Sequence, residues 1–245
     1  MTTLLLYKDI KALNREAHRT LKLRTAQNCE FAAATHLVPV AGLEFFQAAR
    51  HYPLVFVGEG AKATPIALLG LKEGHNGYVD GNHQWQANTY IPAFVRRYPF
   101  VMAQDDAHNF TVCFDAAYSG WNEESGRELF DAEGRNSEFL DEMIQFLQNF
   151  TTEMERTRQF VAKLDELQLL SSRTLTLTHA SGETFVLSDF QAVDEAKFLG
   201  LADEQVLDLH RSGFLAWIYA HLMSLGNTNQ LFDDYLKKKG EVSGH

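Results

Sequence analysis

The chain has 245 residues, of which 45% are hydrophobic and 12% aromatic, which is enough to build a substantial core in one large domain. Its formal net charge of -10 and the lack of a long basic stripe argue against a nucleic-acid-binding protein, because such proteins gather Lys and Arg on one face. No apolar run is long enough to span a bilayer, and the N-terminus lacks the features of a signal peptide. Cys29 and Cys113 show no metal-binding spacing. We therefore expect a cytoplasmic protein in a reducing compartment.

The first part of the chain predicts a sheet. Residues 1–30 are polar and mixed, and we expect them to lie peripherally on a core made by residues 31–245. Short apolar and β-branched runs separated by Gly, Asn and Pro predict strands of a mixed or antiparallel sheet. These runs are 36–40, 53–58, 65–71, 78–80 and 110–114. The segment AGLEFFQAAR (41–50) predicts a helix, and the glycine-rich GEGAKATP predicts a hairpin loop because it lacks both nucleotide-binding fingerprints.

The second part of the chain is predominantly helical. Residues 138–168 repeat apolar side chains at steps of three and four, with Asn136 or Ser137 as the N-cap. This pattern is also compatible with a dimeric coiled coil, but phenylalanines widen the stripe beyond a narrow seam, which favours packing across the chain's own sheet. A hairpin is predicted over 173–190, and helices over 203–225 and 228–239, with Asp203 as an N-cap and Ser212-Gly213 as a possible division. The fold class predicted is α+β in a single domain, with the helices 138–168 and 203–225 covering the sheet.

The stretch YIPAFVRRYPFVM (90–102) places Arg96 and Arg97 side by side in an apolar and aromatic run. Burying a guanidinium is costly unless an anion or several acceptors meet it. Pro92 suits the first turn of a short helix and Pro99 would end it. Neighbouring side chains on a helix point about 100° apart, so at most one arginine is expected to turn inward.

Two interpretations of the arginine pair remain open. In the first, the inward arginine binds a carboxylate or phosphate in a pocket with aromatic neighbours. The candidate ligand-binding residues are then Arg96, Arg97, Tyr98, Tyr90 and Trp85. In the second, which we favour, the arginines only make a structural ion pair that ties loops together. The arginine that does not turn inward would cover the rim or reach an acidic partner such as Asp105, Asp106 or Asp115.

Other chemical signals are weak. His75 and His83 flank Asp80, but the spacing matches no known metal motif, and we expect neither a metal nor a cofactor. His210 and His221 lie near the last apolar helix, where a structural histidine is more common than a general base. No GxSxG motif is present, and neither cysteine has an obvious basic activator. The sequence gives no catalytic residue.

An ordered set of segments carries a family resemblance. The segments are LNREAHRTLKL, VPVAGLEFFQAARHYPLVFVG, PIALLGLKEGHNGYVD, YIPAFVRRYPFVM, ELFDAEGRNSEFLDEMIQFLQNF and LHRSGFLAWIYAHLMSLGN. Together they resemble the bacterial SapC family over about residues 12 to 236. The family meant is the surface-layer-associated one and not the membrane permease of a peptide transporter with the same label. The resemblance transfers no catalytic residues.

The resemblance implies a role near a cell-envelope, surface-layer or uptake system. We therefore predict a soluble cytoplasmic binding or accessory protein whose partner is a protein or an anionic small ligand, and a homodimer is compatible with the sequence. The alternative is an enzyme of unrecognised type that acts on an anionic small molecule or peptide through residues 85–98. Whether the chain is an enzyme stays open at this point.

Overall fold

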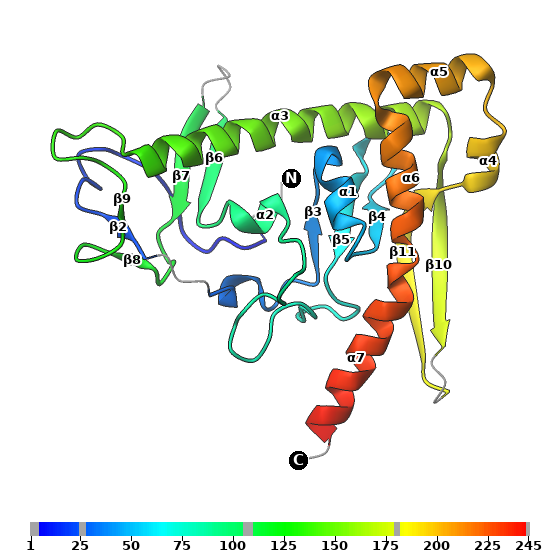
Figure 1. Ribbon diagram of the computed structural model, residues 1–245, viewed down its shortest axis with the longest axis horizontal. Coiled ribbons are helices and arrows are strands. Elements are labelled where there is room, and N and C mark those ends of the chain that lie inside the picture. The colour runs from blue at the N-terminus through cyan, green and yellow to red at the C-terminus, as the bar shows by residue number, and fades with distance from the viewer. Residues whose placement is uncertain (1–4, 25–27, 105–109, 179–181, 244–245) are drawn as a thin grey trace.

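The computed structural model describes residues 5–24, 28–104, 110–178 and 182–243, and it has the α+β fold class predicted (Figure 1). Its helices are η1 (Glu30–Ala32), η2 (Gly42–Glu44), α1 (Phe45–Ala48), η3 (Gly60–Lys62), α2 (Ala93–Arg96), α3 (Glu138–Glu166), α4 (Glu195–Leu199), α5 (Asp203–Ser212), α6 (Phe214–Ser224) and α7 (Asn227–Ser243). Its strands are β1 (Ile10–Ala12), β2 (Lys22–Leu23), β3 (Leu37–Pro39), β4 (Leu54–Val57), β5 (Thr64–Leu68), β6 (Phe100–Gln104), β7 (Phe110–Asp115), β8 (Trp121–Asn122), β9 (Arg127–Glu128), β10 (Leu170–Thr178) and β11 (Thr184–Val193).

The larger sheet has five antiparallel strands in the order β10-β11-β4-β5-β3. β4 and β5 form a hairpin around η3, which confirms the interpretation of the glycine-rich segment as a loop between strands. The predicted hairpin over 173–190 extends this sheet, because Gln191 of β11 pairs with Phe56 of β4. The expected strand 78–80 is wrong, since Val79 makes only an isolated bridge with Trp85. The expected helix 41–50 is shorter and begins as a 3-10 turn.

A second sheet is built from β1, β7 and β6. The sequence placed 110–114 in one sheet with the strands that precede it, but β7 pairs with β6 on one side and with β1 on the other. The N-terminal segment is therefore more than a peripheral cover. Ile10 pairs with Asp115, and farther along Leu23 of β2 pairs with both Trp121 and Arg127 in a small third sheet. These pairings satisfy backbone groups that a sheet edge would leave open.

Helix α3 runs along both sheets (Figure 1). Ser137 is its N-cap, as predicted, and its hydroxyl accepts a hydrogen bond from the Leu140 amide at 3.2 Å. Glu138 and Asp141 in the first turn suit the positive end of the helix dipole. Leu147 and Leu164, from the apolar stripe, are almost fully buried in two different clusters of the core. The stripe is thus used within the chain, across both sheets.

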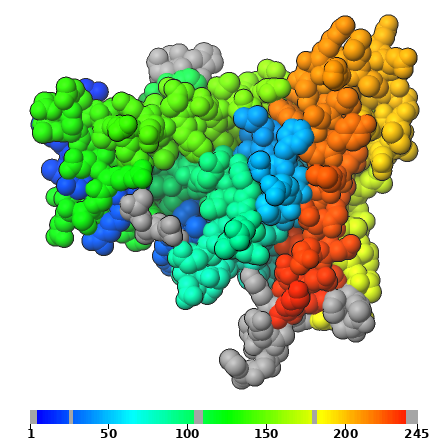
Figure 2. Space-filling model, in the orientation of Figure 1, coloured from blue at the N-terminus to red at the C-terminus, as the bar shows by residue number. Residues whose placement is uncertain are grey.

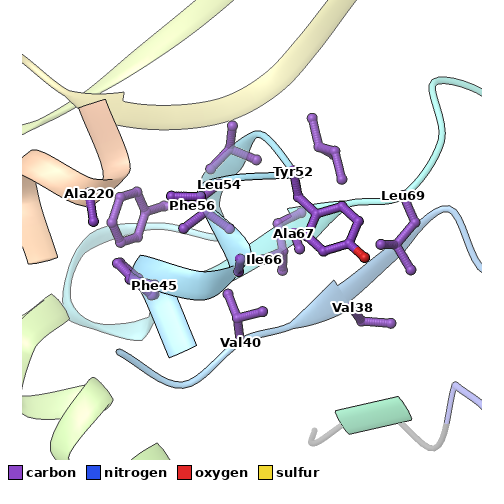
Figure 3. Close-up of a cluster of buried hydrophobic side chains, with 14 of the residues drawn as sticks. Val38, Val40, Phe45, Tyr52, Leu54, Phe56, Ile66, Ala67, Leu69 and Ala220 are labelled. Carbon is purple, nitrogen blue, oxygen red and sulfur yellow. The ribbon is translucent and has the colours of Figure 1, made fainter. Parts of the chain in front are cut away.

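The main core lies where β3, β4 and β5 meet α1 and α6, and Figure 3 shows Phe45 and Phe56 beside Ala220 of α6. The predicted helix 203–225 divides at Gly213, whose φ of +79° is a left-handed conformation that glycine adopts without a Cβ penalty. The N-cap of α5 is Ala202 and not Asp203, which is the first helical residue. The division turns α6 back onto the sheet.

Candidate functional site

The segment 90–102 has the local structure that its prolines predict. Pro92 is the N-cap of α2, a single turn over Ala93–Arg96, and a cis Tyr98–Pro99 peptide precedes β6. Proline has no amide hydrogen to offer and suits both ends of so short a helix. The segment therefore presents its side chains from one tight turn between the two sheets.

The two arginines point apart, as their adjacency on a helical turn predicts. Arg96 is exposed, and its Nε donates to the Ile91 carbonyl at 3.0 Å while its Nη2 donates to the Tyr90 hydroxyl at 3.1 Å. Its guanidinium carbon lies 5.6 Å from the Tyr90 ring centre and 5.2 Å from that of Phe146, within cation–π range. Arg96 thus covers the rim of the segment.

Arg97 is the inward arginine, with only 7% of its surface exposed. Its guanidinium carbon lies 4.1 Å from the ring centre of Phe94, 5.0 Å from that of Phe150 and 5.8 Å from that of Tyr7. Burial lowers the pKa of Arg97, and a hydrogen bond with Tyr7 opposes this effect. Its Nε has no hydrogen-bond partner among the described residues. Three aromatic rings therefore surround the buried guanidinium and make cation–π contacts with it.

The structural ion pair that we favoured is not formed between either arginine and Asp115. Asp105 and Asp106 lie outside the described residues. Asp115 is fully buried, and its carboxylate accepts hydrogen bonds from the amides of Lys8, Asp9 and Ala117 and from the Tyr98 hydroxyl. Burial raises the pKa of Asp115, but these four hydrogen bonds outweigh it and the pKa is lowered. Two of its donors, the Lys8 and Asp9 amides, belong to the N-terminal segment, which Asp115 thereby ties to β7.

Glu44 is a polar residue of this region that sequence reasoning missed. Although only 7% exposed, its carboxylate accepts hydrogen bonds from the Tyr90 hydroxyl at 2.7 Å and the Ala93 amide at 2.6 Å. Its other oxygen accepts from the Ala41 amide at 3.0 Å. The available signal was a single carboxylate in the apolar run AGLEFF. The Tyr90 hydroxyl donates to this carboxylate and accepts a hydrogen bond from Arg96, so it links the guanidinium of Arg96 to Glu44.

The five candidate residues do not converge on one pocket. Tyr90 and Arg96 are joined, whereas Tyr98 stacks on Phe31 with ring centres 4.0 Å apart and donates to Asp115. Trp85 is buried, and its Nε1 donates at 3.3 Å to the hydroxyl of Tyr52, which in turn donates to the Tyr90 carbonyl. The structure places them around α2 as parts of three separate contacts.

Two cavities occur elsewhere. The first holds about 10 Å³, roughly one water molecule, between α7 and the loop before Trp85. The second is an open surface groove of about 340 Å³ in which Lys22 pairs with Glu128 at 3.0 Å and Thr20 donates to Glu123 at 3.0 Å. Neither cavity is lined by Arg96, Arg97 or Tyr98.

The titratable candidates have structural partners. Asp80 Oδ1 accepts from the amides of Asn82 and Gln84, which closes the turn that carries His83. Within the described ranges, no group of three or more His, Cys, Asp or Glu side chains could hold a metal ion. Burial raises the pKa of both cysteine thiols, which lowers their thiolate fraction.

His221 is fully buried at the interface of α6, β4 and β11. Its Nε2 accepts a hydrogen bond from the Val193 amide at 3.0 Å, so this nitrogen carries no proton. Burial lowers its pKa to about 4, against the opposing effect of the Leu54 backbone. The sequence favoured a structural histidine satisfied by a neighbouring carbonyl; the partner observed is instead the Val193 amide, and Nδ1 has no hydrogen-bond partner among the described residues.

Exposed apolar side chains gather on η2, α1 and α6, and sequence reasoning did not identify them. Leu43 and Phe46 are 61% and 51% exposed, and Tyr219 and Met223 are 55% and 64% exposed. The last two are one turn apart on α6 and therefore neighbours. α1 packs on α6, and Figure 2 shows the two elements side by side on one face of the molecule. Asn227, one turn beyond Met223, donates to the Ala49 carbonyl at 2.7 Å. We call these four residues the α1–α6 face.

The ordered segments, now placed on one fold, agree with the comparison with family models. The SapC family model matches residues 13–231. The chain belongs to the SapC family. Neither the comparison with curated proteins nor that with solved structures gives a match. In this SapC chain, no helix in the part that the structure describes is long and apolar enough to cross a membrane. Two of the segments that mark the family, VPVAGLEFF and YIPAFVRR, are joined by the contacts of Glu44.

Proposed function

We propose that this SapC-family chain is a cytoplasmic binding or accessory protein that serves a cell-envelope, surface-layer or uptake system and recognises a protein partner through the α1–α6 face. The observation that carries the proposal is the exposure of four large apolar side chains on three adjoining elements, η2, α1 and α6. Large apolar side chains left exposed on adjoining elements of a folded domain are candidate contacts for another protein. The envelope role is taken from the family resemblance.

Further features support binding over catalysis. The buried carboxylates of Glu44 and Asp115 are occupied by donors within the chain, so they hold the fold and are not presented to a substrate. Both cysteines are unpaired, which suits a reducing compartment such as the cytoplasm.

The test compares partner recovery by matched variants. Phe46→Glu combined with Met223→Glu places two charges on the α1–α6 face, whereas Leu207→Glu changes an apolar side chain on α5 that is 45% exposed. We expect cross-linking and affinity purification from native cells to recover the same partner with the wild type and Leu207→Glu but not with the double variant. Recovery by all three proteins, or by none, would contradict the proposal.

The alternative function, an enzyme acting on an anionic small molecule or peptide, rests on one observation. The Nε of Arg97 is buried and has no hydrogen-bond partner among the described residues. An anion that displaced part of the aromatic cage would supply that partner. Titration of inorganic phosphate and of short acidic peptides by calorimetry tests this hypothesis, which requires saturable binding by the wild type and weaker binding by Arg97→Lys.

A further inference from the structure

Strand β10 forms one edge of the five-stranded sheet. It pairs with β11 on one side, and no strand among the described residues pairs with its other side. Proteins commonly protect such an edge with Lys, Pro, a very short strand or a covering element. β10 has nine residues and contains neither Lys nor Pro. Its one charged residue, Arg173, lies 3.5 Å from Asp194 and is already paired. The pairing with β11 has one register shift, between Arg173 and Leu175, and runs regularly from Leu175 to Thr178. Along this regular stretch the edge is competent to accept another strand.

The sequence of β10 is self-complementary. Residues 174–178 read TLTLT, which is the same in both directions. In an antiparallel two-fold pairing centred on Thr176, Thr174 would face Thr178 and Leu175 would face Leu177. No charged residue lies in this stretch, so no like charges would oppose each other.

The two faces of the strand also match in such a pairing. Thr174, Thr176 and Thr178 are exposed on one face, whereas Leu177 is buried and Leu175 partly buried on the other. Side chains alternate between the faces of a sheet, so the register centred on Thr176 keeps leucines beside leucines on the covered face. On the solvent-exposed face, threonine side chains directly opposite each other interact favourably.

We propose that two copies of this chain pair through their β10 edges, antiparallel and centred on Thr176, so that the two five-stranded sheets become one continuous sheet. The contact is isologous and closes with two-fold symmetry, which limits it to a dimer. The strand that pairs with this edge is β10 of a second copy, because residues 174–178 match themselves in an antiparallel pairing. This interface is separate from the α1–α6 face and does not depend on the function proposed above.

The first experiment measures the molecular mass in solution by sedimentation equilibrium over a dilution series. Thr176→Lys places two ammonium groups opposite each other at the symmetry centre, whereas Ser188→Lys adds the same charge to an exposed position on β11, an inner strand. We expect dimers for the wild type and Ser188→Lys and monomers for Thr176→Lys, with unchanged circular dichroism. A monomeric wild type, or a dimeric Thr176→Lys protein, would overturn the proposal.

A second experiment tests the register. Directly opposed residues of an antiparallel pair have Cα atoms about 4.5–5.5 Å apart, within the range of about 4.4–6.8 Å that a disulfide bridges. In a background with Cys29 and Cys113 replaced by alanine, Thr176→Cys should form an interchain disulfide on mild oxidation, and Ser188→Cys should not. Failure of Thr176→Cys to cross-link, or equal cross-linking by both variants, would refute this arrangement.

Discussion

Lowering the pH below 6.5 should destabilise the fold through His221. The imidazole is fully buried, and its Nε2 accepts the hydrogen bond of the Val193 amide at 3.0 Å. Protonation of Nε2 would place two N–H donors against each other, and it would leave a positive charge beside the Phe56 ring in the core. The neutral ring is therefore part of the junction between α6 and the sheet.

The sign and size of the effect follow from the two pKa values. The folded pKa is about 4, and an unperturbed histidine in the unfolded chain has a pKa of about 6.5. Between these values the unfolded chain binds the proton and the folded chain does not, so the free energy of unfolding rises with pH there. The contribution is complete above pH 6.5 and is lost as the pH falls toward 4. At about 1.4 kcal/mol per pH unit, the loss approaches about 3 kcal/mol.

Urea unfolding at a series of pH values, followed by circular dichroism, provides the assay. His221→Gln retains an acceptor oxygen within reach of the Val193 amide but does not titrate. Carboxylates such as Asp115 contribute equally to both proteins, so the difference between their unfolding free energies isolates the histidine. We expect the wild type to lose about 3 kcal/mol more than His221→Gln between pH 7 and pH 4. Parallel pH profiles for the two proteins would refute the reasoning.

Substitutions at Gly42, Glu44 and Arg97, with Gly81 as a control position, test the packing by chemical denaturation. Gly42→Ala should cost about 1–3 kcal/mol, because its Cβ would lie 2.2 Å from the Trp217 ring, while Gly81→Ala, which meets open space, should change little. Glu44→Gln should cost about 1–3 kcal/mol, because an amide nitrogen cannot accept one of the three hydrogen bonds that the carboxylate receives. Arg97→Met should be more stable than Arg97→Lys, because a buried ammonium keeps the desolvation cost without stacking on the rings. The reverse order would show that the charge of Arg97 stabilises the fold.

Local patterns predicted most of the elements. The three- and four-residue steps of α3 and its cap at Ser137, the hairpin at 173–190, and the turn enclosed by Pro92 and Pro99 all depend on residues close in sequence. The same local geometry predicted that Arg96 and Arg97 point apart. Whether residues 85–98 bind a ligand stays a prediction.

By itself, the sequence determined the class of the fold, the family, and the positions of the long helix α3 and of the β10–β11 hairpin. Only the tertiary structure decided which residues meet each charge. Arg97 received three aromatic rings in place of the expected carboxylate, and Asp115 received the amides of the N-terminal segment, which is more than a hundred positions away. It also decided that β6 and β7 belong to a separate sheet. A charge or a strand edge is satisfied by whichever group the folded chain brings near it. Because that group can be far away in the sequence, local periodicity does not predict it.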